Sequence, residues 1–343
     1  MSLDLFHPTV AAWFTSRFGA PTEIQALAWP RIAAGAHTLV VAPTGSGKTL
    51  TGFLWPLDRL LTGAWEGGGV RVLYVSPLKA LNADIERNLE EPLAGLAAAL
   101  EAAGEEPRPV RVGVRSGDTP PAERQRMLRR PPEILITTPE SLNLLLLGKR
   151  AEALFRGLRL VLLDEIHAVA GSKRGTHLIT AVERLTRVAG EFQRVAISAT
   201  VRPASGIARF VGGARLERGA GGEARFERRP VEVVESRAAK RYELAVRHVG
   251  DLSDEALAVS PDALWLRLAD ELRARIAEVR STLVFTNSRR LAERLTRLVN
   301  DAAGREVAWS HHGSLSRELR TTVERRLKRG ELPALVATSS LEL

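Results

Sequence analysis

The sequence is poor in several residue types, and each shortage narrows what the protein can be. It has no cysteine among 343 residues, which excludes a disulfide framework and thiolate metal sites and fits a reducing cytosol. Aromatic residues make up 5% of the chain, which argues against a nucleic-acid platform built from many stacked rings. No apolar run reaches the ~18 residues of a membrane-spanning helix. The N-terminus, Met1 to Leu5, lacks the positive region of a signal peptide, so we expect a cytoplasmic protein.

The rest of the composition is that of a globular protein with excess positive charge. The length predicts two domains, each large enough to bury its own core. The formal net charge of +9 indicates a polyanionic partner such as DNA or RNA. Charge alone decides little, because basic runs such as Arg289 to Arg297 are also typical of solvated helix faces.

The stretch from Val40 to Thr49 has the pattern of a strand followed by a phosphate-binding loop. Its glycines allow a tight turn in which backbone N–H groups and the next helix face a nucleotide phosphate. Lys48 would reach the β- and γ-phosphates, and Thr49 would hold Mg²⁺. Ala42 replaces the first glycine of the usual motif, so a plain glycine-rich turn is the alternative. The residues expected to bind the nucleotide here are Thr44, Gly45, Ser46, Gly47, Lys48 and Thr49.

A short segment before this loop adds two further candidates for nucleotide binding. Thr22 has the character of a helix N-cap before Ile24. Gln25 carries both a donor and an acceptor, the pair that reads the N6 and N7 edge of adenine. A lone glutamine on a helix is usually solvated, but its place just upstream of the loop favours the adenine-binding interpretation.

Apolar strands alternate with helical patterns through the first half of the chain, which predicts βαβ units and a parallel sheet. Ligand sites of such sheets lie at the carboxyl ends of the strands. Several of these ends are polar and could contact phosphates, although each is also compatible with a plain turn. The predicted strands are Val70 to Val75, Val110 to Val114, Glu133 to Thr137, Leu158 to Leu163 and Arg194 to Ile197.

Candidate catalytic and coupling residues follow two of these strands. Asp164 and Glu165 follow a buried strand, where Asp164 can hold Mg²⁺ through water and Glu165 can orient and deprotonate an attacking water. His167 is either a satisfied core histidine or a link to the next loop. That loop contains Ser198 and Thr200, whose hydroxyls can hydrogen-bond the acidic segment and couple it to a neighbouring domain.

The second half of the chain predicts an interdomain stretch followed by another α/β domain. Gly212 to Pro230 is rich in Gly, Arg and Glu, as expected between domains. The adjacent histidines, His311 and His312, have no Cys or acid at ligand spacing, so contact with nucleic acid is a better interpretation than a metal site. The predicted strands are Val231 to Val234, Glu243 to Val249, Thr282 to Thr286, Val307 to Ser310 and Ala334 to Thr338, and the predicted helices are Leu264 to Val279 and Leu315 to Arg329.

Taken together, these segments resemble the ordered motifs of a superfamily 2 helicase. The amino-acid sequence of several motifs is similar to that of the large helicase-related (Lhr) family. These motifs are Ala42 to Thr49, Pro77 to Asn82, and Asp164 to His167 followed by Gly171 to Gly175. The resemblance implies an α/β fold of two RecA-like domains, the second incomplete, with limits 1–212 and 236–343 around a linker at 213–235. It also implies ATP-driven movement along single strands with 3′-to-5′ polarity and a link to DNA repair.

The resemblance further implies an Arg-rich motif that reaches back to the ATP, which we expect beyond Leu343. Nucleic acid is expected to cross the edge of both sheets opposite the ATP and to be held mainly through its phosphates, so sequence preference should be slight. The expected contact residues are Lys79, Arg115, Thr138, Thr286, Asn287, His312 and Thr338. Two other functions stay open: an ATP-driven duplex translocase that never separates strands, and an ATP-gated clamp without turnover. The motifs also do not decide between DNA and RNA.

Overall fold

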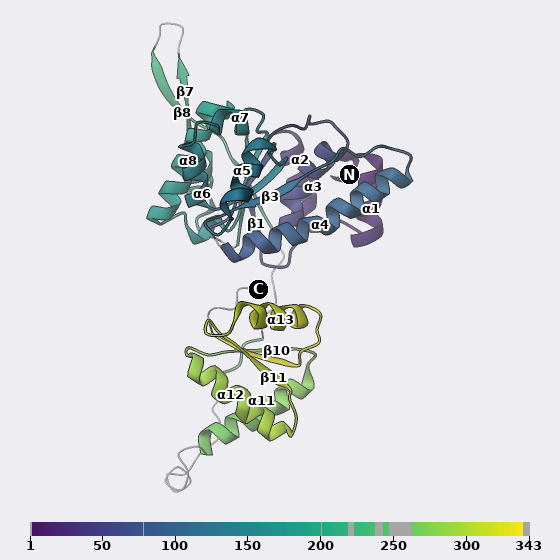
Figure 1. The fold of residues 1–343 in the computed structure, drawn as a ribbon, viewed down its shortest axis with the longest axis vertical. Coiled ribbons are helices and arrows are strands. Elements are labelled where there is room, and N and C mark those ends of the chain that lie inside the picture. The colour runs from purple at the N-terminus through teal and green to yellow at the C-terminus, as the bar shows by residue number, and fades with distance from the viewer. Residues whose placement is uncertain are drawn as a thin grey trace. The chain divides into compact units, whose positions relative to one another are not determined.

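A computed structural model describes residues 2–77, 79–199, 201–218, 223–236, 243–246 and 263–338 of the protein. The chain divides into two compact units, Met1–Arg241 and Tyr242–Leu343, and each is described by itself (Figure 1). Among the described residues, no helix combines the length and the apolar character needed to cross a membrane.

The first unit alternates helices with strands. Its strands are β1 (Thr38–Val41), β2 (Val72–Val75), β3 (Val112–Arg115), β4 (Ile134–Thr137), β5 (Leu160–Leu163), β6 (Gln193–Ser198), β7 (Ala214–Arg218), β8 (Ala224–Arg228) and β9 (Glu232–Glu235). Its α-helices are α1 (Pro8–Phe18), α2 (Glu23–Ala33), α3 (Lys48–Leu61), α4 (Lys79–Ala102), α5 (Pro121–Arg129), α6 (Pro139–Leu146), α7 (Ala151–Phe155), α8 (Lys173–Ala189) and α9 (Ala204–Gly212). Short 3-10 helices are η1 (Ser2–Leu5) and η2 (Ile166–Ala168).

A seven-stranded parallel sheet organises this unit, in the order β3-β4-β2-β5-β6-β1-β9. Strands β1, β2, β4 and β5 are buried at every position, as expected where helices cover both faces of a parallel sheet. Helices α1 to α4 cover one face of the sheet and helices α5 to α9 cover the other (Figure 1). Side chains of each group form the core on their face. The predicted parallel α/β fold is confirmed.

The segment predicted as a linker contains strands of the first unit. β7 and β8 form an antiparallel hairpin, and β9 pairs with β1 at the edge of the sheet. The charged residues that suggested a linker form cross-strand ion pairs instead, as between Arg215 and Glu227 at 2.7 Å. The compact unit therefore extends to Arg241, beyond the predicted limit at 212.

The second unit holds a smaller parallel sheet of three strands, in the order β10-β12-β11. The elements are α11 (Ala263–Glu278), β10 (Thr282–Phe285), α12 (Arg289–Ala303), β11 (Ala308–His311), α13 (Arg317–Lys328) and β12 (Ala334–Ala337). These confirm the three strands predicted for the second domain. The strand predicted at Glu243 to Val249 is wrong where it is described, because residues 243–246 have no regular structure, and the remainder lies outside the described residues.

Candidate nucleotide-binding site

Three neighbouring strands bring the predicted nucleotide-binding segments together at the carboxyl ends of the strands of the first sheet. β6 lies between β1 and β5, and all three run parallel. The phosphate loop follows β1, the acidic segment follows β5, and Ser198 ends β6. Because the carboxyl ends of parallel strands meet at one edge, segments far apart in sequence converge there.

The loop between β1 and α3 has the backbone of an anion cradle. Gly45 and Gly47 have φ angles of +79° and +84°, a left-handed conformation that favours glycine. A Cβ atom at Gly47 would lie 2.8 Å from the Gln25 Nε2 atom, so a side chain would also collide there. Ala42 is buried and is not among the described residues with a positive φ, which explains why alanine fits where the usual motif has glycine.

The polar side chains of the loop are suited to receive a phosphate. Lys48 is only 8% exposed, and its Nζ donates to the Ala42 carbonyl oxygen at 2.6 Å. The buried Ser46 hydroxyl has no hydrogen-bond partner in the described part of the chain. Buried polar groups without partners are costly, and a phosphate oxygen would give this hydroxyl a partner. The loop therefore fits a nucleotide.

Thr22 and Gln25, at the start of α2, support the loop from the side. The Thr22 N–H donates to Gln25 Oε1 at 2.9 Å, and the Thr22 hydroxyl donates to the Ser46 carbonyl oxygen at 3.1 Å. Gln25 is 3% exposed, and its Nε2 lies 3.5 Å from the Gly47 carbonyl oxygen. Both amide atoms of Gln25 thus contact protein groups here, and its contact with adenine stays a prediction.

Asp164 is fixed by two hydrogen bonds at the end of β5. Its Oδ1 accepts from the Glu165 N–H at 2.8 Å, and its Oδ2 accepts from the Tyr74 hydroxyl at 2.6 Å. Burial raises the pKa of this carboxyl, while the Tyr74 hydrogen bond and the Lys48 charge act in the opposite direction. A carboxylate with one donor on each oxygen keeps free lone pairs for a further ligand.

Glu165 is the described non-glycine residue with a left-handed backbone, at φ 49°. Such strain persists where the surroundings hold it, and it often occurs at functional sites. Burial and the Asp164 charge raise the pKa of Glu165 above its usual range. The side chain is therefore shifted toward the pKa of a general base that works near neutral pH.

His167 connects Glu165 to the loop after β6. Its Nδ1 lies 3.2 Å from Glu165 Oε2 and 3.3 Å from the Ala199 backbone nitrogen. The Ala199 N–H can donate only to an unprotonated Nδ1, whereas a protonated Nδ1 would donate to Glu165. Ser198 is fully buried and its hydroxyl has no partner among the described residues, whereas Thr200 lies outside them.

The donor set also fits a magnesium ion. Thr49 and Asp164 supply the hard oxygen atoms that Mg²⁺ prefers. No group of three or more His, Asp or Glu side chains in the described part of the chain could hold a metal alone. Mg²⁺ usually keeps several waters and takes other ligands from substrate phosphates.

The predicted nucleic-acid contacts of the first unit lie at the same sheet edge as the phosphate loop. Arg115 ends β3, and Thr138 follows β4. Arg115 is partly buried, its Nη1 has no partner in the described part of the chain, and burial and Arg124 lower its pKa. The Thr138 hydroxyl accepts from the Ser141 N–H and caps α6. Lys79 begins α4, but its side chain lies outside the description.

The predicted contacts of the second unit also lie where strands end. Thr286 and Asn287 follow β10, and Thr338 follows β12. His312, after β11, is 1% exposed, with its Nε2 atom 3.0 Å from Glu293 Oε1. Within their own sheets, the predicted contact residues lie at the carboxyl ends of strands, as the phosphate loop does in the first unit. Their contact with nucleic acid stays a prediction.

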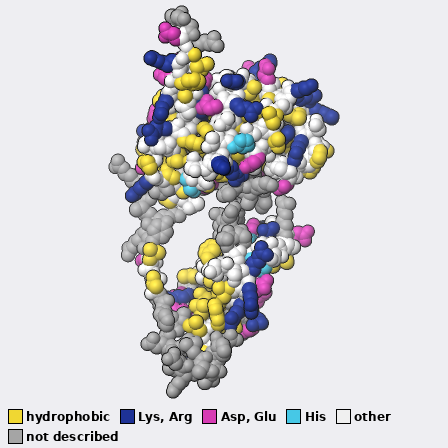
Figure 2. Space-filling view, turned by 90° about the vertical axis from the view of Figure 1, so that its left-hand side faces the viewer, with side chains coloured by type: hydrophobic (Ala, Val, Ile, Leu, Met, Phe, Trp, Pro, Cys, Tyr) yellow, Lys and Arg dark blue, Asp and Glu magenta, His cyan; other side chains and the backbone are white. Residues whose placement is uncertain are grey.

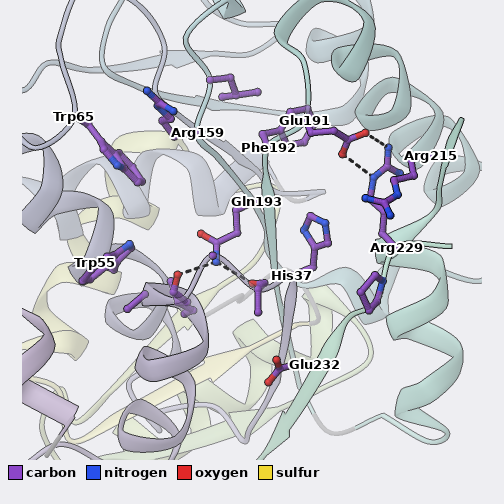
Figure 3. Close-up of a pocket in the computed structure, with 16 residues that line it drawn as sticks. His37, Trp55, Trp65, Arg159, Glu191, Phe192, Gln193, Arg215, Arg229 and Glu232 are labelled. Atoms are coloured by element: carbon purple, nitrogen blue, oxygen red, sulfur yellow. Dashed lines mark hydrogen bonds and ion pairs between the residues drawn. The ribbon is translucent and has the colours of Figure 1, made fainter. Parts of the chain in front are cut away.

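A separate cavity of about 640 Å³ lies at the other edge of the first sheet, beside the amino ends of β1, β6 and β9. Figure 3 shows His37, Trp55 and Trp65 in its lining. Glu191 and Arg229 are joined there by two hydrogen bonds of 2.7 and 2.8 Å. This cavity contains none of the predicted nucleotide-binding residues.

Comparison with known proteins decides the family. The model of the DEAD/DEAH box helicases matches residues 22–206, and that of the helicase conserved C-terminal domain matches residues 265–343. The chain belongs to the DEAD/DEAH box helicase family.

Within this helicase family, the chain resembles Lhr proteins, as its motifs predicted. It is 42% identical to the Lhr helicase/probable uracil glycosylase of Mycolicibacterium smegmatis, over 99% of this chain and 24% of that protein. It is also 42% identical to ATP-dependent helicase Lhr-Core protein 2 of Thermococcus barophilus, over 99% of this chain and 39% of that protein. The structure of Mycobacterium smegmatis helicase Lhr bound to ssDNA and AMP-PNP matches with a TM-score of 0.81 and 44% identity, over 100% of this chain and 42% of that one. The chain thus spans a minor part of these relatives.

Sequence reasoning missed two contacts of this helicase site. The Thr22 hydroxyl holds the Ser46 carbonyl oxygen, and the Tyr74 hydroxyl holds Asp164. Tyr74 gave a weak signal, because it is the one side chain with a polar tip in the run Val72 to Val75. Its partner could be found only from the register between β2 and β5.

Proposed function

We propose that this helicase-family chain is an ATP-driven motor and that Mg-ATP binds over Thr44 to Thr49 of the first unit. The observation that carries the proposal is the convergence of a buried lysine with two carboxylates at the ends of β1 and β5. Lys48 lies close enough to Asp164 and Glu165 for its charge to oppose the rise in pKa that burial causes in both carboxyl groups. A lysine that contacts phosphate and an acid that activates water are the parts that phosphoryl transfer requires.

Each side chain has a separate task in the proposed reaction. Lys48 leaves the Ala42 carbonyl oxygen and contacts the β- and γ-phosphates. Thr49 and Asp164 hold Mg²⁺, which when bound supplies positive charge against the transferring phosphate. Glu165 orients the attacking water and takes its proton.

The remaining predicted residues have supporting tasks. Thr22 and Gln25 place the adenine, and Gln25 exchanges a contact with the loop for one with the base. His167 changes its partner between Glu165 and the Ala199 N–H. Together with Ser198 and Thr200, it would pass the state of the nucleotide to the segment after β6.

We further propose that the chain moves 3′-to-5′ along a single strand in the cytoplasm, unwinds duplex DNA or RNA–DNA hybrids, and serves DNA repair. The single-stranded DNA in the similar M. smegmatis structure and the net charge of +9 support a nucleic-acid partner, with DNA favoured over RNA. The proposed contacts are Lys79, Arg115, Thr138, Thr286, Asn287 and Thr338. His312 is left out of this set, because its side chain is buried beside Glu293.

Two substitutions test the nucleotide site. Lys48→Ala should abolish binding of a fluorescent ATP analogue, because the lysine contacts phosphate in the ground state. Glu165→Gln should bind the analogue as the unsubstituted chain does but release phosphate about 10³-fold more slowly, within the range for loss of a general base. Glu152→Gln is the matched control, since Glu152 is exposed on α7 and pairs with Arg156.

The same assays separate the rival functions. Unchanged phosphate release by Glu165→Gln would refute the assignment of the base. ATP binding without turnover, with and without single-stranded DNA, in a longer protein that includes the Arg-rich motif expected beyond Leu343, would favour a nucleotide-gated clamp. Turnover without strand release from a forked substrate would favour a duplex translocase.

A further inference from the structure

The sheet register explains how a tyrosine from the middle of one strand reaches the acid at the end of the next. Tyr74 on β2 pairs with Leu162 on β5. Side chains alternate along a strand, so Leu162 and Asp164 point to the same face as Tyr74. The long phenol side chain spans the diagonal, and its hydroxyl donates to Asp164 Oδ2 at 2.6 Å.

The tyrosine hydroxyl lies where water does not compete for it. Tyr74 is completely buried in the core on the α3 side of the sheet, and its ring stacks on Phe53 with centroids 5.5 Å apart. A buried hydroxyl without a partner is destabilising, and one bonded to a carboxylate is strongly held.

The orientation of the Asp164 carboxylate depends on this donor. The other oxygen, Oδ1, accepts from the Glu165 N–H, which fixes only one side of the group. With the Tyr74 hydroxyl on Oδ2 the carboxylate cannot rotate freely, and one lone pair on each oxygen stays available to accept from water.

We propose that Tyr74 is a positioning residue that orients Asp164 to accept hydrogen bonds from Mg²⁺-bound water. This inference rests on the proposed function, in which Asp164 holds Mg²⁺ through water. Groups of this kind, which hold a metal ligand without touching the metal, typically change metal affinity 10- to 100-fold when removed.

Tyr74→Phe tests the proposal, because it removes the hydroxyl and keeps the ring against Phe53. Binding of a fluorescent ATP analogue is titrated at a series of free Mg²⁺ concentrations and in EDTA. We expect Tyr74→Phe to raise the half-saturating Mg²⁺ concentration about 10-fold and to leave affinity in EDTA unchanged. Phe53→Leu is the matched control, since it loosens the same core, leaves the hydroxyl in place and should not change the Mg²⁺ dependence.

The outcomes are distinct. An unchanged Mg²⁺ dependence in Tyr74→Phe, or an equal change in Phe53→Leu, would overturn the positioning role. Absence of nucleotide binding by the unsubstituted chain at every Mg²⁺ concentration would instead refute the proposed function.

A second measurement needs no substitution at Tyr74. The chain has 2 tyrosines, Tyr74 and Tyr242, so incorporation of 3-fluorotyrosine gives a simple ¹⁹F spectrum that Tyr242→Phe assigns. Addition of Mg²⁺ to the complex with AMP-PNP should shift the Tyr74 resonance, because its acceptor Asp164 then binds the hydrated ion. A Tyr74 resonance that nucleotide shifts but Mg²⁺ does not would contradict the proposal.

Discussion

The edge strands of the two sheets differ in the side chains that they expose. In the first unit, the inner strands β2 and β5 are buried at every position between helices on both faces, and the edge strand β9 exposes Glu232, Val233 and Glu235. In the second unit, the inner strand β12 is also buried at every position, but the edge strand β10 exposes two large apolar side chains, with Leu283 at 40% and Phe285 at 61% exposed. Figure 2 shows hydrophobic side chains at the surface of this unit. Exposed apolar edge strands favour association with other chains.

The buried inner strands of the first unit indicate where the protein can hold a strained backbone conformation. The described residues of the proposed nucleotide site belong to the first unit and include the left-handed Gly45, Gly47 and Glu165. A backbone of this kind needs surroundings that fix it, and the buried strands β1 and β5 supply them. The left-handed residues described in the second unit, Gly304 and Gly330, only follow helices.

The largest expected effect concerns the stability of the two cores. Phe155 is fully buried in the first unit, whereas Phe285 is 61% exposed in the second. Phe155→Ala should cost about 3–5 kcal/mol of unfolding free energy, and Phe285→Ala should cost less than about 0.5 kcal/mol. Urea denaturation followed by far-UV circular dichroism measures both. Equal losses would show that Phe285 is packed in solution and would remove the contrast between the units.

The second effect concerns nucleic acid. Six or so phosphate contacts predict that affinity for single-stranded DNA falls with salt with a log–log slope of about −4 and depends little on sequence. Arg115→Gln should reduce the slope by about 0.7, because one contact is lost. Arg225→Gln is the control, since Arg225 is exposed on the β7–β8 hairpin, whose Arg215 lines the cavity beside the amino ends of the sheet strands. A flat salt response, or an equal effect of Arg225→Gln, would reject this binding mode.

The strands that are continuous apolar runs could be predicted from the sequence. Strands β1, β2, β4 and β5 are continuous apolar runs because helices cover both their faces, and such runs are visible without a structure. The residues of the nucleotide site were predicted because they follow these strands. The hairpin was missed because its strands are charged and exposed, and the place of β9 depends on pairing with β1.

Contacts that depend on strand register, and strained backbone conformations, could not be predicted from the sequence. The bond from Tyr74 to Asp164 arises only when β2 and β5 are aligned, and the left-handed φ of Glu165 does not follow from its residue type. His312 was expected to face nucleic acid, yet its side chain is buried beside Glu293 of α12. Its position after β11 was predictable, but the direction of its side chain was not.

The smallest expected effect is a pH dependence that belongs to the first unit. His37 precedes β1, and its Nδ1 accepts from the Arg194 N–H at 3.1 Å. Burial, together with Arg194 and Arg229, lowers the pKa of His37 to about 4. Between these two pKa values, His37 therefore binds a proton in the unfolded chain, where its pKa is near 6.5, but not in the folded chain.

The contribution of His37 to stability is thus complete above about pH 6.5 and is lost as the pH falls toward the folded pKa of about 4. Because the ring is partly exposed, solvent screening limits the loss to about 1 kcal/mol. His37→Gln should flatten the fall in melting temperature of the first unit between pH 7 and pH 5, while His177→Gln, at an exposed position on α8, should not. An unchanged profile for His37→Gln would show that other groups set the acid sensitivity of this unit.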